Sequence, residues 1–265
     1  MEEMLNEVLR AWPAFLLVAA RALAMIETAP LMSSDSIPQV VKLALAGFAA
    51  YSAFPTALAS NWNVSAYNLT FVYLIIGEGL IGIILGFYLT LIFSAFSTAG
   101  QFFSLQMGFG ASETFDPLAQ AENPLLGQYL NIVAMLVFVS VGGFQELFLG
   151  GFWRSIQTIN IVDIAAGREH VISMLLTGLS GLFLDAMIIS MPILGTLFLT
   201  SLTTGLISKA APQVNILSEG FPISITVAFV LIYTSLPFMV EAFSRVIDAG
   251  FKNIENLYAY LGGAL

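Results

Sequence analysis

The sequence has no cysteine, a single histidine and very few charged residues. Only 9% of its 265 residues are charged, whereas 58% are hydrophobic. Without cysteine, neither a disulfide framework nor a thiolate site is possible, and one histidine leaves no zinc site of ordinary type. No glycine-rich phosphate loop with a lysine is present either, so nucleotide binding is unsupported. These absences predict a protein that is not an enzyme and that uses no metal or cofactor.

Basic residues are scarce as well. Eight Lys and Arg stand against 17 Asp and Glu, a net charge of -9, and nucleic-acid binding would need a basic surface. Soluble domains carry roughly 25% charged residues, so a surface this poor in charge must be solvated by lipid or by other hydrophobic subunits. The first residues are acidic, whereas a cleaved signal peptide starts with a basic region, so the first apolar run is expected to stay in the mature protein. The composition predicts an integral membrane protein.

Long apolar runs predict an all-α fold with long, kinked helices in a single domain. Pro192 and Pro237 lie inside two of these runs and are expected to kink them. The region from Gly150 to His170 is expected to be a loop, and the tail from Ser244 looks amphipathic. The predicted helices are Trp12–Leu31, Val40–Leu58, Leu69–Leu105, Leu125–Leu149, Val171–Lys209 and Ile223–Phe243.

Two of the predicted helices are too long for a plain bilayer span. Leu69–Leu105 would be about 55 Å long at 1.5 Å per residue, against a hydrocarbon core of about 30 Å. Either this helix breaks between Gly77 and Gly82, or it leaves the bilayer and is covered by other protein. Each over-long run ends in a polar tip rich in Gly and Pro, after which a shorter helix returns. This pattern is typical of helical hairpins.

Ionisable residues inside the apolar runs cost on the order of 3 kcal/mol each in lipid. They are Arg21, Glu27, Glu78 and Asp185. One interpretation makes Glu78 or Asp185 a proton-relay carboxylate in a secondary transporter. The favoured interpretation pairs the acids with Arg21 or with a neighbouring subunit, so that they hold helices in register. The nearby glycines Gly77, Gly79, Gly82 and Gly86 lie at a spacing typical of close helix packing.

The polar tip Gln106–Pro124 has two interpretations. It is either a surface loop that joins two helices, or a segment that closes a pore. Its apolar residues Met107, Phe109, Ala111 and Phe115 favour burial, because irregular backbone survives at membrane depth only inside protein or along a cavity. Flexible Met and Phe side chains also suit a seal against irregular neighbours or a dewetting constriction.

Several motifs resemble the FliR/SpaR/YscT family, the single-copy R subunit of the export gate in flagellar and virulence type III secretion. The resemblance covers nearly the whole chain, and its most specific parts are the tip after Leu105 and the segment after Lys209. The matching motifs are Ala29-Pro30 with Ile37-Pro38 and Lys42, Gly77-Glu78-Gly79-Leu80-Ile81-Gly82, Gly86-Phe87, Gly100-Gln101, Leu105-Gln106-Met107-Gly108-Phe109, Asp116-Pro117, Gly205-Leu206, Ala211-Pro212-Gln213-Val214-Asn215-Ile216 and Gly220-Phe221-Pro222.

This resemblance implies a fusion of a P-like part, residues 12–149, with a Q-like helical hairpin, residues 171–243. Together with P-type and Q-type subunits it would form a channel in the bacterial inner membrane, within the flagellar basal body. Unfolded export substrates would pass through that channel. The B-type switch protein, the A-type export protein and membrane lipid are the other implied partners, and no nucleic acid is expected. The flagellar branch is favoured over the virulence branch, and a secondary transporter is the alternative from another class.

The resemblance also implies roles for particular residues. A plug at 108–123 would close the channel, and a second tip would lie at its entrance. Departures from the family pattern occur at Glu113, Phe144 and Ser224, and Glu113 makes a fully apolar seal doubtful. The implied plug residues are Met107, Gly108, Phe109, Gly110, Ala111, Phe115, Asp116 and Pro117; the helix-packing or inter-subunit residues are Arg21, Glu78, Gly79, Gly82 and Asp185; the entrance residues are Pro212, Gln213, Asn215, Phe221 and Pro222.

Overall fold

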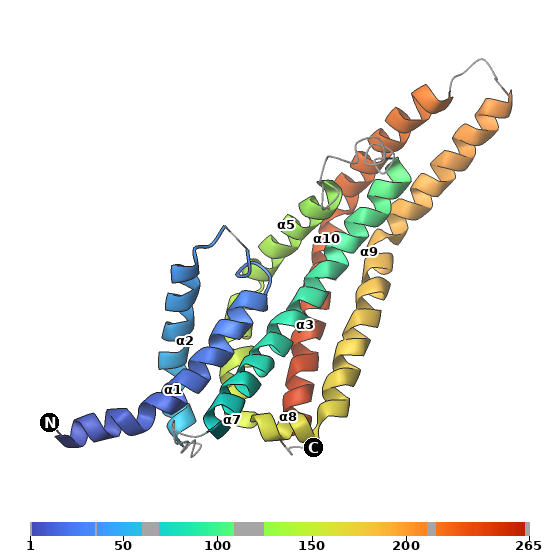
Figure 1. The fold of residues 1–265 in the computed structure, drawn as a ribbon. Coiled ribbons are helices and arrows are strands. Elements are labelled where there is room, and N and C mark those ends of the chain that lie inside the picture. Colours follow the sequence, from blue (N-terminus) through green and yellow to red (C-terminus); the bar gives the residue numbers. More distant parts are fainter. Residues whose placement is uncertain (1, 35, 60–68, 109–124, 211–215, 263–265) are drawn as a thin grey trace. The chain divides into compact units, whose positions relative to one another are not determined.

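A computed structural model of the chain describes residues 2–34, 36–59, 69–108, 125–210 and 216–262 (Figure 1). Within these ranges the regular structure is helical and no strand occurs, which confirms the all-α prediction. The elements are α1 (Glu2–Thr28), α2 (Gln39–Ala59), α3 (Leu69–Met107), α5 (Leu125–Ser140), α6 (Gly143–Gln145), the π-helix η1 (Glu146–Trp153), α7 (Arg154–Thr158), α8 (Ile161–Ala166), α9 (Arg168–Ala210) and α10 (Ile216–Leu261).

In the part of the chain that the structure describes, four helices are long and apolar enough to cross a membrane: α2, α3, α9 and α10. Helix α5 with the segment Gly143–Thr158 passes the same test as a bent pair. Large apolar side chains on these helices are widely exposed; Phe48 is 71% and Phe238 73% exposed. Such a surface requires lipid or protein neighbours, because water would not solvate it. The protein is therefore an all-α integral membrane protein, as the composition predicts.

The three longest helices are continuous. Helix α3 has 39 residues and runs without interruption through Gly77–Gly82, so the alternative of a break at these glycines is wrong. Helix α9 has 43 residues and continues through Pro192. Helix α10 has 46 residues and includes both Pro222 and Pro237. These lengths exceed the roughly 20 residues that a bilayer span needs.

Helix α1 begins earlier than predicted, at Glu2 rather than Trp12, and α5 ends earlier, at Ser140 rather than Leu149. Helix α10 is longer than predicted at both of its ends. Helix α10 begins before Ile223 and extends past Phe243 to Leu261. The extension has a physical reason, because Ile247, Phe251, Ile254 and Tyr258 recur at helical spacing and all four are buried. The expected amphipathic tail is therefore the last part of α10.

The region expected to be a loop between Gly150 and His170 is largely helical, which corrects that prediction. It contains the end of η1, the short helices α7 and α8, and the start of α9. Phe152, Ile156 and Ile159 are buried, whereas the charged Arg154 is exposed. Its charged residues suggested a loop, but Arg154 lies on the exposed side of α7, and Arg168 and Glu169 form the first turn of α9.

The chain forms two compact units. Unit 1 comprises Met1–Leu91, Gly142–Gly178 and Asp248–Leu265, and unit 2 comprises Ile92–Val141 and Leu179–Ile247. Each unit therefore draws on both of the sequence parts expected to be P-like (12–149) and Q-like (171–243). The division into these parts stays an expectation from the family resemblance, and it does not coincide with the compact units.

Unit 1 has α1 packed along α2 and along the first part of α3 (Figure 1).

Unit 2 has a core of aromatic rings. The ring centroids of Phe96 and Phe243 are 4.3 Å apart, and those of Phe93 and Phe138 are 5.4 Å apart. In unit 2, Gly100 of α3 lies directly against Gly127 of α5; a Cβ at Gly100 would lie 2.5 Å from the Cα of Gly127. Glycine at this position lets the two helix backbones touch.

Candidate functional site

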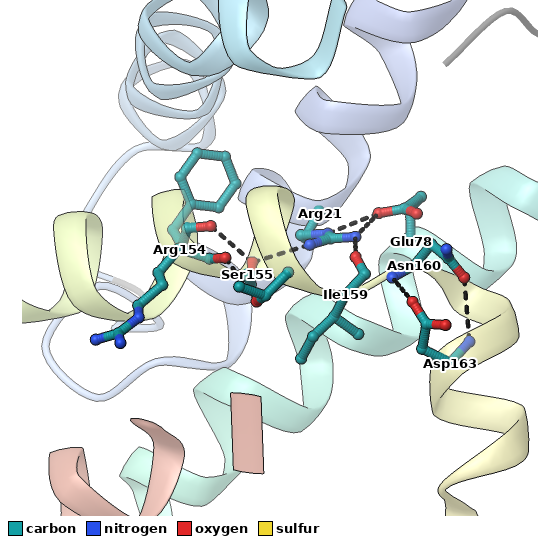
Figure 2. A network of polar contacts seen from close by, with 9 residues as sticks. Arg21, Glu78, Arg154, Ser155, Ile159, Asn160 and Asp163 are labelled. Atoms are coloured by element: carbon teal, nitrogen blue, oxygen red, sulfur yellow. Dashed lines mark hydrogen bonds and ion pairs between the residues drawn. The ribbon is translucent and has the colours of Figure 1, made fainter. Parts of the chain in front are cut away.

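The most polar part of the core is centred on Arg21, in unit 1. Arg21 lies on α1 and is completely buried. Its Nε donates to Glu78 Oε2 over 2.6 Å, Nη1 donates to Ser155 Oγ over 2.9 Å, and Nη2 donates to the Ile159 carbonyl oxygen over 3.0 Å (Figure 2). A buried charge is tolerated only when it is paired and hydrogen-bonded. Arg21 therefore joins α1 to α3 and to the α7–α8 turn.

Glu78 on α3 is the ionic partner of Arg21. Its side chain is 3% exposed, and its Oε2 also lies 2.5 Å from Nη2 of Arg21. This contact depends on the glycines of α3, because a Cβ at Gly82 would lie 2.9 Å from the backbone nitrogen of Met25. A Cβ at Gly86 would lie 2.8 Å from the Met25 carbonyl oxygen. The glycines thus let α3 approach α1 closely enough for the carboxylate to reach the guanidinium.

The Ile159 carbonyl is available because the helix stops there. Ile159 has an extended backbone (φ -134°, ψ 131°) between α7 and α8. Asn160 then caps α8: Asp163 N–H donates to Asn160 Oδ1 over 3.1 Å, and Asn160 N–H donates to Asp163 Oδ2 over 2.9 Å (Figure 2). This reciprocal pair is a capping box, which fixes the start of a helix. It holds the turn that presents the carbonyl to Arg21.

The π-helix η1 leads into this turn and is held by α10. The Tyr258 hydroxyl donates to the Gly151 carbonyl oxygen over 2.7 Å, and Tyr258 is 1% exposed. Ser155, which accepts from Arg21, donates to the Phe152 carbonyl oxygen over 2.6 Å. A π-helix leaves backbone groups outside the regular helical ladder. Here one such carbonyl is bonded by the neighbouring Ser155 and another by Tyr258, which is distant in the sequence.

A second ion pair closes the hairpin of α1 and α2. Lys42 Nζ donates to Glu27 Oε2 over 3.1 Å and to the Ser33 carbonyl oxygen over 3.2 Å. Lys42 is 3% exposed, so its charge depends on these partners. Leu31, in the turn between them, has φ 72°. A non-glycine residue in this conformation marks a tightly held turn.

The predicted site residues fall into different places. Arg21, Glu78 and Gly82 come together in unit 1. Gly79 does not join them, since a Cβ there would meet no atom within 4 Å among the described residues. Asp185 lies on α9 in unit 2, is half-buried, and makes no hydrogen bond or ion pair with any residue that the structure describes.

The structure describes only the start of the predicted plug. Met107 ends α3 and is fully buried. Gly108 follows with φ 90°, and its N–H donates to the Leu105 carbonyl oxygen over 3.1 Å. Glycine in this conformation is a common helix C-terminal cap. The six other predicted plug residues lie outside the described residues: Phe109, Gly110, Ala111, Phe115, Asp116 and Pro117.

The predicted entrance tip is described only in part. Pro212, Gln213 and Asn215 lie outside the described residues. Phe221 and Pro222 belong to α10, and the Pro222 carbonyl oxygen accepts a hydrogen bond from the Thr226 hydroxyl over 2.8 Å.

Sequence reasoning missed several residues of the polar core. Nothing in the sequence marks Ser155, Ile159 or Tyr258 as part of a polar core, because serine and tyrosine are common in apolar helices. The spacing Asn160-Ile161-Val162-Asp163 was the one available signal, because it matches a capping box before an apolar helix.

The arrangement is suited to holding helices rather than to chemistry. Arginine is not deprotonated in proteins, so Arg21 keeps its charge and needs the hydrogen-bond partners that join the helices. Among the described residues no group of three His, Asp or Glu side chains is placed to hold a metal ion. The fold and this core define an all-α integral membrane protein whose helices are held together by a buried Arg–Glu pair.

Comparison with known proteins gives the family. Residues 12–250 match the family model described as "Bacterial export proteins, family 1". The chain belongs to this family, which confirms its resemblance to the FliR/SpaR/YscT proteins.

Relatives of this chain are flagellar biosynthetic proteins. The flagellar biosynthetic protein FliR of Bacillus subtilis (strain 168) is 28% identical over 261 residues, 97% of this chain and 99% of that protein. FliR of Escherichia coli (strain K12) is 30% identical over 239 residues, 90% of this chain and 88% of that protein. FliR of Buchnera aphidicola subsp. Baizongia pistaciae (strain Bp) is 31% identical over 219 residues, 83% and 84% of the two chains.

Proposed function

We propose that this chain is a subunit of the flagellar protein export apparatus. In detail, it is the R-type subunit of an export gate in the bacterial inner membrane, within the flagellar basal body. With P-type and Q-type subunits it forms the channel through which unfolded flagellar subunits cross that membrane. The observation that carries this proposal is the family match over residues 12–250, together with flagellar relatives aligned over almost their whole length.

The lengths and surfaces of the helices support lateral protein partners. Helix α9, with 43 residues, would be about 64 Å long, roughly twice the hydrocarbon thickness. Apolar side chains are exposed near both of its ends; Leu176 is 59% and Leu206 69% exposed. Lipid cannot cover both at once on a helix of this length, because tilts rarely exceed about 40°. P-type and Q-type subunits would cover the remainder.

The same proposal makes residues 108–123 the plug of the channel. The buried Met107 and the cap at Gly108 end α3 in a fixed position immediately before this segment. The close contact of Gly100 with Gly127 holds α3 and α5, the helices on either side of it. The entrance tip around Pro212–Pro222 would face the B-type switch protein and the A-type export protein.

Particle composition tests the gate assignment. The full chain would be co-expressed with the P-type and Q-type proteins of the same bacterium, purified through a tag on this chain, and weighed by native mass spectrometry. We expect one stable particle that contains all three proteins. Recovery of this chain alone, as a stable monomer under the same conditions, would contradict the assignment and favour a transporter.

Ion leakage tests the plug. Residues 109–122 would be replaced by a short Gly-Ser linker, and the proton permeability of cells that express the complete gate would be measured. We expect permeability to rise severalfold, whereas the same linker in place of residues 211–215 leaves it unchanged. Equal permeability of the plug variant and the wild type, with particle mass unaltered, would rule the plug out while leaving the gate assignment intact.

A further inference from the structure

The helical segment from Gly143 to Thr158 in unit 1 has buried residues spaced four apart. They are Gly143, Leu147, Gly151 and Ser155. A step of four residues in an α-helix overshoots a full turn by about 40°, so three such steps would turn the buried face through about 120°. A π-helix closes each hydrogen bond over five residues rather than four, and so takes more residues to a turn. The π-helix η1, in the middle of this segment, therefore lets the four residues stay on one side.

The last hydrogen bonds of η1 show where an extra residue is held. The Arg154 N–H donates to the Leu149 carbonyl oxygen, five residues before it, and also to the Gly151 carbonyl oxygen. In an α-helix the acceptor would be the carbonyl oxygen of Gly150, four residues before. The turn between Leu149 and Arg154 therefore contains one residue more than an α-helical turn does.

This extra residue decides which of two neighbouring side chains faces Arg21. Ser155 is buried and bonds to Arg21, whereas Arg154 points away from it (Figure 2). Arg154 pairs instead with Glu255, and both side chains are about half exposed. A continuous α-helix would bring Arg154, seven residues after Leu147, to within about 20° of the buried direction of Leu147. Two guanidinium groups would then meet where the structure places a guanidinium and a hydroxyl, and a buried charge without a partner is strongly destabilising.

Two consecutive glycines in η1 are not required by the space around them. A Cβ at Gly151 would make only ordinary contacts, the nearest with Leu147 Cδ1 at 3.7 Å. A Cβ at Gly150 would meet only Oε2 of Glu146, the end of an exposed and flexible side chain, at 2.9 Å. Glycine weakens a regular helix but admits other backbone conformations. The pair therefore suits the π-helical backbone rather than the packing around it.

Two hydroxyl groups hold the π-helical backbone through side-chain hydrogen bonds. Tyr258 donates to the Gly151 carbonyl oxygen, and Ser155 donates to the Phe152 carbonyl oxygen. In an α-helix the Gly151 carbonyl would instead accept from the Ser155 N–H, four residues on. Tyr258 therefore stabilises this carbonyl in the conformation that η1 has.

We propose that η1 is a register device: it holds one residue more than a continuous α-helix would, and this residue places Ser155 instead of Arg154 against Arg21. The chain should therefore tolerate the loss of one residue inside η1, because the remaining residues can close as an α-helix without moving the contacts on either side. The inference is independent of the export function, because it uses only contacts within unit 1.

Deletion of Gly150 from the full chain tests this proposal. In the variant lacking Gly150, the bond from Arg154 N–H to the Leu149 carbonyl becomes a regular α-helical bond. We expect this variant, purified in detergent, to unfold at the temperature of the wild type or higher, as monitored by circular dichroism.

The matched control deletes Gly79 from the regular helix α3, where a Cβ would meet no atom within 4 Å among the described residues. Loss of one residue there turns one part of α3 by about 100° relative to the other, so that Glu78 and Gly82 can no longer both face α1. We expect the variant lacking Gly79 to unfold at a much lower temperature than the wild type. An equal fall in unfolding temperature for the two deletions would overturn the proposal.

Hydrogen exchange asks whether the deletion of Gly150 has removed the π-helix. In the wild type, Tyr258→Phe should quicken exchange of amides near Gly151 about tenfold, because a buried carbonyl loses its donor. In the variant lacking Gly150, the same substitution should change this exchange by less than about twofold, because an α-helical ladder supplies the Gly151 carbonyl with the Ser155 N–H. An equal effect of Tyr258→Phe in both backgrounds would also overturn the register device.

Discussion

Arg21 is a charged side chain in a place where packed apolar residues leave no water to solvate it. Glu78 offsets its charge, while Ser155 and the Ile159 carbonyl each accept one of its other N–H groups. Removal of one partner from such a pair leaves an uncompensated buried charge and costs roughly 3–5 kcal/mol. Replacement of both partners by apolar residues of similar volume often changes the stability little. The pair therefore contributes mainly by fixing which helices meet.

A double-mutant cycle tests this view of the pair. We expect Glu78→Gln and Arg21→Met each to lower the stability of the detergent-solubilised chain by about 3 kcal/mol or more, because each leaves one buried partner unsatisfied. The double variant R21M/E78Q should lose much less than the sum of the two single losses. The stability losses of the two single variants and the double variant are measured by thermal unfolding, monitored by circular dichroism.

The matched control is the exposed pair Arg245–Glu241, whose side chains are 71% and 67% exposed. Arg245→Met should change stability by less than about 1 kcal/mol. Additive losses for R21M and E78Q would show that the two buried residues do not act together.

Helix α3 is the element on which the packing of unit 1 depends. Its glycines are not equivalent, although their spacing in the sequence is regular. Gly82 and Gly86 lie against the backbone of α1, Gly77 lies against Ile161, and Gly79 faces open space among the described residues. Only the glycines in contact allow the close approach that brings Glu78 to Arg21.

Alanine substitutions at two of these glycines distinguish packing from helix propensity. We expect Gly82→Ala to destabilise the chain by a few kcal/mol, since its Cβ would meet Ala24 Cβ and Met25 N at 2.9 Å and force α1 and α3 apart. Gly79→Ala should be neutral or stabilising by up to about 1 kcal/mol, because alanine favours helix. The unfolding temperature of each variant measures the difference. A similar loss at both positions would contradict the assigned packing.

The last part of α10 is held to the π-helix by one hydrogen bond. Tyr258→Phe leaves the Gly151 carbonyl oxygen without its donor, so we expect a loss of about 1–3 kcal/mol. Hydrogen exchange should then quicken for amides near Gly151 and near the end of α10. Tyr260→Phe is the control, because Tyr260 is 45% exposed and its hydroxyl has no hydrogen bond to a described residue. Unchanged exchange in Tyr258→Phe would mean that the bond does not hold α10.

At the scale of the whole molecule, much of the surface is apolar and would need lipid or protein partners to cover it. Apolar side chains are exposed along helices that exceed the thickness of a bilayer, and Asp185 has no ionic partner among the described residues. Burying an unpaired carboxylate in lipid costs on the order of 3 kcal/mol. A partner from a neighbouring subunit would remove that cost.

Asp185→Asn tests whether its partner comes from another subunit. We expect the isolated chain to unfold at the same temperature as the wild type or higher, because no intramolecular ion pair is lost. Recovery of the complete particle with P-type and Q-type proteins should fall severalfold. Normal particle yield, with loss of a solute-uptake activity instead, would favour the transporter alternative.

The amino-acid sequence by itself determined the class of this protein. Its low charge and long uninterrupted apolar runs favour membrane-embedded helices, because a helix satisfies its backbone hydrogen bonds within one segment. It also located the ionisable residues in the apolar runs, because their cost there does not depend on the details of packing.

The tertiary structure alone decided which of these residues meet. Arg21 and Glu78 are 57 positions apart, and nothing local distinguishes Glu78 from Asp185 as a partner for Arg21. The choice depends on the register of α3 against α1, which Gly82 and Gly86 set through direct backbone contact. The same holds for the Gly150–His170 region: its charges suggested a loop, but it is largely helical and buries Phe152 and Ile156. Pairing across a core is a property of how surfaces fit, and sequence spacing does not encode it.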